Sequence, residues 1–214
     1  KQDGISFFLI DMHAPGITVK PTILMDGSHE VNEVFLDDVR VPDANLIHKE
    51  GRGWEVAKYL LNYERLNAGK IGVSKWQLFQ LKKFARQQSI DSRSLLDISR
   101  FSDRLSRIEI ELMALEITNL RYLDRMVRSG EPPGPEVSLL KIKGTAIQQQ
   151  LSELMLHAAG PDNIYDISEG GDRGASINSM NVLAQRYFNL RKLTIYGGSD
   201  EIQRNIIART YLGL

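Results

Sequence analysis

The feature that most constrains the fold is an apolar pattern with helical spacing between residues 101 and 123. Its steps are mainly four and three residues, so its members share one face of a long helix. A helix with a single apolar face buries that face only when other helices pack against it. The pattern therefore predicts an antiparallel helical bundle, with a seam formed by Phe101, Leu105, Ile108, Leu112, Leu115, Leu120 and Leu123.

Helical patterns also occupy the rest of the chain after residue 53. Gly69 and Gly72 fall inside the first of these patterns, where each glycine costs about 1 kcal/mol and usually marks a close helix contact. Loops rich in Gly, Pro or Asp separate the later patterns, as at residues 129–135 and 162–174. We expect four long helices and one short one, over residues 53 to beyond 81, 101–123, 136–158, 176–190 and 199 to about 211.

The first 47 residues are typical of β-strands. Apolar runs at residues 5–10 and 17–20 precede an alternating segment at residues 31–41, which follows a turn signal. Three strands leave open edges and half a core, so we expect the end of a larger β-domain. A small sheet on the helical body is the alternative. The expected fold is mainly α, with a partial β-domain of a few strands over residues 1–50 and a C-terminal antiparallel helix bundle over residues 51–214.

Composition excludes several classes of function. The 27 basic residues balance the 27 acidic ones, so no global field draws in nucleic acid or an anionic membrane. Because the chain has no Cys, disulfides, thiolate catalysis and Cys-ligated zinc are excluded, and its four scattered His residues predict no metal site. We found neither a signal segment nor an apolar run long enough to span a membrane, and we expect a cytoplasmic protein.

Two motifs point to a family. The first is Val34-Phe35-Leu36-Asp37-Asp38-Val39-Arg40-Val41-Pro42, followed by Gly51-Arg52-Gly53-Trp54. The second is Thr194-Ile195-Tyr196-Gly197-Gly198-Ser199-Asp200-Glu201-Ile202-Gln203-Arg204-Asn205-Ile206-Ile207-Ala208. Together they closely resemble the flavin-dependent acyl-CoA dehydrogenase family, from the later strands of its middle β-domain through its C-terminal helical domain.

The resemblance implies a reaction and partners. The reaction is α,β-dehydrogenation of an acyl-CoA thioester, in which a Glu removes the α-proton and the β-hydrogen leaves as hydride to N5 of FAD. The implied partners are the acyl-CoA substrate, an electron-transferring flavoprotein as acceptor, and further copies of the chain in a homodimer or homotetramer.

The catalytic base is the residue at which this chain departs from many family members. Their base is a Glu directly before the Gly of the C-terminal motif, and Gly197 occupies that position here. In another branch the base sits on the first long helix in a Glu-Arg-Leu motif, which Glu64, Arg65 and Leu66 match. The resemblance therefore implies Glu64 as base and Arg65 as a residue near the acyl-CoA. The alternative for Glu64 is a surface carboxylate paired with Lys70 or Arg65.

The remaining site residues are also implied by the resemblance. A backbone amide at Gly197 would donate to the thioester oxygen, and Tyr196 would lie near flavin and substrate. Ser199 and Glu201 match positions that touch FAD, although capping of the last helix is a compatible role for both. Arg86 is the counterpart of an Arg that reaches the FAD of a neighbouring subunit, but Gln87 and Gln88 replace the Phe-Gly pair that often follows it in the family.

Other departures keep further functions open. The third helix of the family usually ends in Gln-x-x-Gly-Gly, whereas Leu156 and Ala159 replace the Gln and one Gly here. That change fits a branch in which two unlike subunits share a site, as in a heterotetramer. A catalytically silent subunit and a related flavin oxidase or monooxygenase are the alternatives to a catalytic dehydrogenase.

Overall fold

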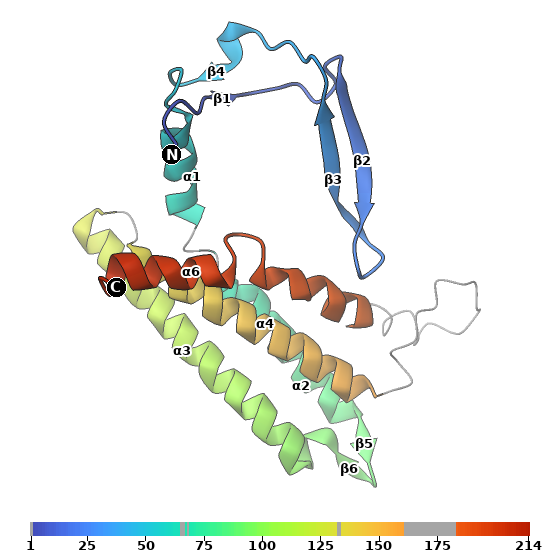
Figure 1. Ribbon diagram of the computed structural model, residues 1–214. Helices are drawn as coiled ribbons and strands as arrows, with labels where there is room; N and C mark the ends of the chain where they lie inside the picture. The colour runs from blue at the N-terminus through green and yellow to red at the C-terminus, as the bar shows by residue number, and fades with distance from the viewer. Residues whose placement is uncertain (1, 65–66, 68, 132–133, 161–182) are drawn as a thin grey trace. The chain divides into compact units, whose positions relative to one another are not determined.

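The computed structural model describes residues 2–64, 67, 69–131, 134–160 and 183–214 (Figure 1). The chain forms two compact units, Lys1–Glu64 and Arg65–Leu214. The expected domain boundary at residue 50 falls just before the helix α1 (Gly53–Glu64), whereas the compact units divide at the end of that helix.

The first unit contains two short antiparallel pairings. Strand β1 (Phe7–Phe8) pairs with β4 (Leu46–Ile47), and β2 (Ile17–Ile23) pairs with β3 (His29–Leu36). The 3₁₀ turn η1 (Asp43–Asn45) precedes β4. Helix α1 then begins at Gly53, whose N–H donates to the carbonyl oxygen of Ile5 at 2.7 Å. A side chain at Gly53 would collide with the backbone of Ser6 and Phe7, which explains why glycine starts this helix.

The strands lie where they were expected, but their lengths differ from the prediction. The run at residues 5–10 contributes only the two residues of β1, and the alternating segment leaves the sheet after Leu36 instead of continuing to Val41. Every residue of β3 is exposed, including Val34 and Phe35. Within the described residues, the hairpin therefore has no apolar core of its own.

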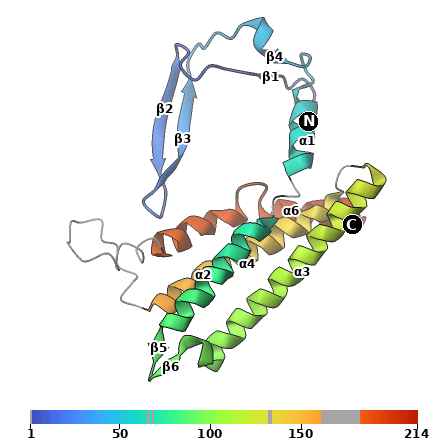
Figure 2. The same cartoon turned by 180° about the vertical axis from the view of Figure 1, so that it is seen from behind.

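The second unit is a helical bundle (Figure 1 and Figure 2). Its long helices are α2 (Ile71–Gln87), α3 (Ser99–Ser129) and α4 (Ser138–Ala159). Residues 183–189 are helical and lead through the 3₁₀ helix η6 (Leu190–Thr194) to α6 (Asp200–Ile206) and the π-helical turn η7 (Ile207–Tyr211). The connections contain β5 (Ser89–Ile90), β6 (Arg93–Ser94), η3 (Leu95–Asp97) and η4 (Pro135–Val137).

Helix α4 is the central element of this bundle. It contacts α2, α3, η6 and α6, and it is therefore buried on nearly every side. The fully buried side chains of Leu140, Ile147, Leu151 and Leu154 form its contribution to the core. The expected mainly α fold with a few strands is confirmed by this arrangement. Among the described residues, no helix has both the length and the apolar character that crossing a membrane requires.

The seam of α3 is confirmed in its first half and wrong in its second. Phe101, Leu105, Ile108, Leu112 and Leu115 are buried, but Leu120 and Leu123 are exposed. The four-and-three spacing continues from Leu115 through residues 119, 122 and 126, which are half-buried. Leu120 and Leu123 lie one position beyond these residues and are exposed.

The single helix expected from residue 53 past residue 81 is also wrong. Helix α1 ends at Glu64, and α2 begins at Ile71 after Lys70, whose φ of 46° is left-handed. Gly69 does mark a close contact, because a side chain on Gly144 of α4 would collide with the Gly69 backbone. Gly72 lies inside α2 beside open space, so it marks no contact among the described residues.

The boundaries of α4 agree closely with expectation, whereas α3 runs to Ser129, six residues beyond the expected end at residue 123. Helix α3 ends at Ser129 with Gly130 in the left-handed region at φ 69°, the usual geometry of a glycine cap. Helix α4 begins at Ser138, because residues 135–137 form η4. The loop expected at residues 162–174, Pro161 and the start of the helix expected from residue 176 lie outside the described residues.

Candidate functional site

The glycine turn from Tyr196 to Ser199 connects η6 to α6. Gly197 and Gly198 have φ angles of 68° and 82°, which glycine adopts without strain. The N–H of Ile195 donates to the carbonyl oxygen of Lys192 at 2.9 Å and closes the last 3₁₀ turn of η6, and the N–H of Tyr196 donates to the same oxygen at 3.1 Å. Within the described part of the chain, the N–H groups of Gly197 and Gly198 donate to no protein acceptor. Both are therefore available to an oxygen atom of a ligand.

Gly197 gives this turn no carboxylate. Among the described residues, nothing lies within 4 Å of the position that a Cβ would take there. The space would accept a side chain, although the positive φ would strain its backbone. The position thus supplies a backbone donor and no proton acceptor.

Ser199 is the N-cap of α6, as the sequence predicted. Its Oγ accepts a hydrogen bond from the N–H of Ile202 at 3.4 Å. Glu201 follows in the first turn, where its hydrogen bonds to its own backbone N–H and to the Ser199 hydroxyl hold the pKa of its carboxyl below the ordinary value. Contact of either residue with FAD stays a prediction.

A buried ion pair, not foreseen from the sequence, attaches the start of α6 to α4. The Nζ of Lys141 lies 2.8 Å from Oδ1 of Asp200, and the two side chains are 8% and 13% exposed. Removing one partner of such a pair typically costs about 3–5 kcal/mol, because the other charge stays buried without compensation. The sequence feature that could have indicated this pair is a lysine within the apolar run of α4 from Leu139 to Ile142.

Gln203 holds the turn from its other side. Its Nε2 donates to the carbonyl oxygen of Gly197 at 3.2 Å, and its side chain is buried. A side chain on Gly198 would collide with this amide group. The second glycine of the motif is therefore favoured mainly by the positive φ, because the Gln203 amide lies at the end of a flexible side chain that can shift.

Polar side chains of α4 satisfy the carbonyl groups of η6. Gln149 Nε2 donates to the carbonyl oxygen of Leu190 at 3.1 Å, and Thr145 Oγ1 donates to that of Leu193 at 3.5 Å. In return, a terminal nitrogen of Arg191 donates to the carbonyl oxygen of Gln149 at 3.3 Å. These bonds compensate the irregular backbone before the glycine turn, which would otherwise leave buried carbonyls unpaired.

The first turns of α4 contact two segments of the candidate site. Lys141 binds Asp200 directly after the glycine turn, and Gly144 packs on Gly69 directly before α2. Leu140 also lies against Gly69, since a Cβ there would be 3.6 Å from the Leu140 Cβ. Within the second unit, α4 therefore positions both the glycine turn and the segment that precedes α2.

The other predicted site residues do not all lie close to the glycine turn. Glu64 is the last residue of α1, and Arg65 lies outside the described residues. Tyr196 is exposed. Arg86 is exposed near the end of α2, separated from Ile71 at its start by roughly 22 Å of helix at 1.5 Å per residue. Its predicted role toward the FAD of a neighbouring subunit is a contact between chains, which stays a prediction.

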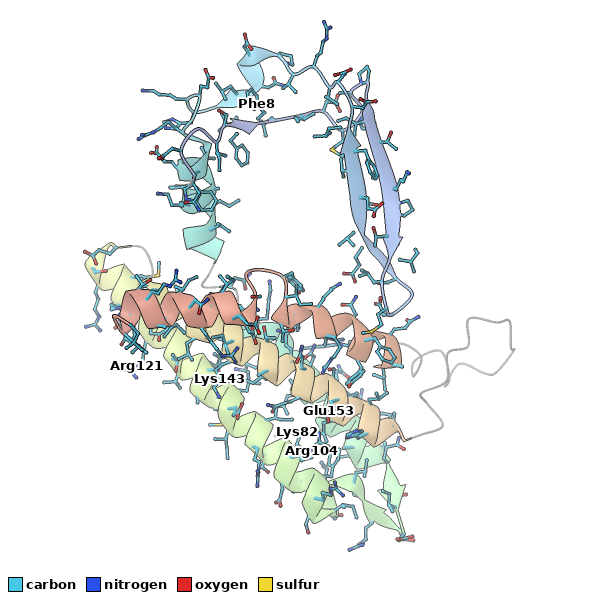
Figure 3. The ribbon with its side chains drawn as sticks, viewed as in Figure 1. Phe8, Lys82, Arg104, Arg121, Lys143 and Glu153 are labelled. Atoms are coloured by element: carbon cyan, nitrogen blue, oxygen red, sulfur yellow. The ribbon has the colours of Figure 1, made fainter. Side chains whose placement is uncertain are left out.

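At the end of α4 the sequence departs from the usual motif. The side chains there pack in the bundle or form polar contacts with α3 at the surface. Leu156 is buried in the bundle. Arg104 of α3 donates to His157 Nδ1 at 2.8 Å and to Glu153 Oε1 at 3.0 Å, and Figure 3 shows Arg104 and Glu153 reaching toward each other from their two helices. Within the described residues, this end of α4 has no glutamine amide to offer a ligand.

Comparison with known proteins identifies the family. The profile of the family described as acyl-CoA dehydrogenase, C-terminal domain, matches residues 51–212. The chain belongs to the acyl-CoA dehydrogenase family. The resemblance seen in the two motifs is thereby confirmed.

Individual family members cover the whole chain at low identity. The acyl-CoA dehydrogenase IpdE1 of Mycobacterium tuberculosis is 30% identical over 219 residues, which are 99% of this chain and 51% of that protein. The acyl-CoA dehydrogenase FadE34 of the same organism is 29% identical over 214 residues, 100% of this chain and 27% of that protein. An acyl-CoA dehydrogenase structure from Geobacillus kaustophilus has a TM-score of 0.80 at 22% identity, covering 99% of this chain and 53% of that one. The chain therefore spans about half or less of the length of these relatives.

Proposed function

We propose that this chain is part of an FAD-dependent acyl-CoA dehydrogenase that introduces an α,β double bond into an acyl-CoA thioester. The observation that carries the proposal is the glycine turn at Gly197 and Gly198, with two N–H groups that have no protein acceptor among the described residues. Membership of the acyl-CoA dehydrogenase family supports the reaction class.

The proposed chemistry needs an acceptor for the α-proton and a donor to the thioester carbonyl. A Gly197 N–H donates to the carbonyl oxygen, where negative charge develops as the α-proton leaves. The Glu64 carboxylate accepts this proton as general base. FAD, when bound, supplies the hydride acceptor for the β-hydrogen, so the two hydrogens leave as a proton and a hydride.

Glu64 is the proposed base because position 197 carries no carboxylate and the Glu64-Arg65-Leu66 motif is present. A carboxylate base in a water-poor site has its pKa raised by desolvation, which brings it toward the operating pH. Arg65 is proposed to lie near the acyl-CoA, and Tyr196 to lie near flavin and substrate.

The residues at the turn have the chemistry to hold FAD. The unpaired N–H groups and the Ser199 hydroxyl are suited to oxygen atoms, and Glu201 can accept hydrogen bonds through an exposed carboxylate. We propose Ser199 and Glu201 as FAD contacts within one subunit and Arg86 as a contact to the FAD of a neighbouring subunit.

Self-association and an electron-transferring flavoprotein acceptor complete the proposal. Helix α3 carries a second apolar stripe, opposite its buried seam, that is exposed in the single chain. The stripe is spaced by three and four residues, which suits packing against another helix. Its members are Ile110, Met113, Ile117 and Leu120. This stripe supports a homodimer or homotetramer.

The test is a flavin absorbance spectrum of the complete gene product, before and after anaerobic mixing with a panel of acyl-CoA thioesters. We expect bound flavin and bleaching of its visible band by at least one thioester. Absence of flavin, or flavin that no thioester reduces, would contradict the proposal.

A catalytically silent subunit of a hetero-oligomer is the second candidate. The observation in its favour is Gly197, which removes the usual base, together with the buried Leu156 at the end of α4. In that case the purified gene product would become reducible by thioester only after addition of a second, unlike subunit.

A further inference from the structure

The Lys141–Asp200 ion pair joins the glycine turn to the centre of the bundle. Lys141 lies on the first turn of α4, and Asp200 is the first residue of α6, directly after Ser199. Their charged atoms are 2.8 Å apart, and both side chains are almost completely buried. The pair spans 59 positions of the sequence, so it connects two segments that have no local reason to meet.

The turn has a fixed side and a freer side, because η6 before it is hydrogen-bonded to α4 and the two glycines after it are flexible. Two consecutive glycines have more conformational freedom than any other residue pair, and both have positive φ here. Gln203 binds the carbonyl oxygen of Gly197 at 3.2 Å, but Gln203 belongs to α6 and moves with it. On the side that leads into α6, the position of the turn relative to α4 therefore depends on what holds the first turn of α6.

The ion pair is suited to that task. A buried lysine that loses its carboxylate partner is strongly unfavourable, so the pair favours one position of Asp200 over nearby alternatives. Asp200 also lies in the first turn of α6, where a carboxylate is favoured by the helix dipole. Lys141 also attracts the exposed Glu201 carboxylate, and this attraction further favours the observed position of the first turn of α6.

We propose that Lys141 is a positioning residue for the dehydrogenation reaction. By binding Asp200, it holds the Gly197 N–H where it meets the thioester oxygen. The inference rests on the proposed function, and it adds to that function a residue on α4 that touches neither substrate nor flavin.

The experiment replaces Lys141 by Met in the complete gene product, with Lys143→Met as the matched control. Lys143 is on the same helix (Figure 3), but it is about half exposed and its carboxylate partner is 4.0 Å away. We expect Lys141→Met to lower the flavin reduction rate at saturating acyl-CoA by about tenfold or more, because misplacing a reacting group by 1 Å can cost about 100-fold. Flavin content should be unchanged, and Lys143→Met should remain within about twofold of the parent, as expected for an exposed pair.

A second readout does not depend on the reaction. Hydrogen exchange at the amides of residues 196–203 should become faster in Lys141→Met and stay unchanged in Lys143→Met. The double variant Lys141→Met/Asp200→Asn should be no slower than Lys141→Met, because the two residues act as one pair.

The outcomes separate the inference from the proposed function. Normal reduction and normal exchange in Lys141→Met would overturn the positioning role, and so would loss of folding in both Lys141→Met and the double variant. If no acyl-CoA reduces the unmodified protein, the proposed function fails, while the exchange measurement still decides whether the ion pair holds the turn.

Discussion

Gly144→Ala is expected to destabilise the bundle, because α4 has no room for a methyl group at this position. An added Cβ would lie 2.7 Å from the Cα and 2.8 Å from the carbonyl carbon of Gly69, and it would also overlap the carbonyl oxygen. Ordinary contacts to a Cβ are longer than 3.4 Å, and the atoms in the way belong to the backbone, which cannot rotate aside as a side chain can.

The size of the effect follows from two opposing contributions. Alanine is a better helix former than glycine by about 1 kcal/mol, and this gain applies at any interior helix position. Forcing extra atoms into a packed contact costs about 1–3 kcal/mol, and occasionally more when backbone must shift. Because the methyl group would meet three backbone atoms, we expect a net loss of about 2 kcal/mol, which lowers Tm by roughly 4–8 °C.

Gly72→Ala is the matched control. Gly72 lies in the first turn of α2, and among the described residues nothing lies within 4 Å of its Cβ position. A helix-propensity gain of up to about 1 kcal/mol therefore has no packing cost against it, and Tm should not fall. Thermal melting of the two variants beside the parent protein checks the prediction. A Gly144→Ala variant that melts at or above the parent temperature would refute the reasoning, because the contact with Gly69 would then tolerate a methyl group.

Three further predictions concern the reaction, the pH dependence of stability and self-association. Glu64→Gln should retain flavin but lower flavin reduction by at least about 100-fold, as for loss of a general base, measured by stopped-flow absorbance; a near-normal rate would show that Glu64 is not the base. Because the pKa of Glu201 is lowered in the folded state, its stabilising contribution is present above the pKa of the unfolded chain and is lost as pH falls through the lowered value. The Tm difference between the parent and Glu201→Gln should therefore shrink below about pH 4, and a constant difference would contradict this. Ile117→Lys places a charge in the exposed stripe of α3 and should shift light scattering toward monomer, whereas an unchanged mass would exclude the stripe from the contact.

Local signals predicted the helical elements well. Helix α3 ends where Gly130 provides a left-handed cap, and α6 begins where Ser199 accepts the hydrogen bond of an N-cap. Each of these features depends on residues within one helical turn, so it can be recognised without knowledge of the rest of the fold. The motif around Gly197 was found for the same reason, since its residues are contiguous.

Periodicity was less informative on α3, where two possible apolar stripes are offset by one residue. Leu120 and Leu123 are leucines on a long helix, but they are exposed because the buried stripe passes through residues 119 and 122. Apolar character alone could not decide between these positions, because α3 presents apolar residues on two faces. Contact with α4 determines which stripe is buried.

By itself, the sequence determined the mainly α fold, the strand-like start, the glycine turn and the family to which the chain belongs. Only the tertiary structure decided that the first helical pattern is interrupted before Ile71, where Gly69 packs on Gly144. It also decided that Lys141 is paired with Asp200 and that Gln203 holds the carbonyl of Gly197. The physical reason is that helix periodicity and capping depend on neighbouring residues, whereas burial of a charge or a close backbone contact depends on segments that meet only in the folded bundle.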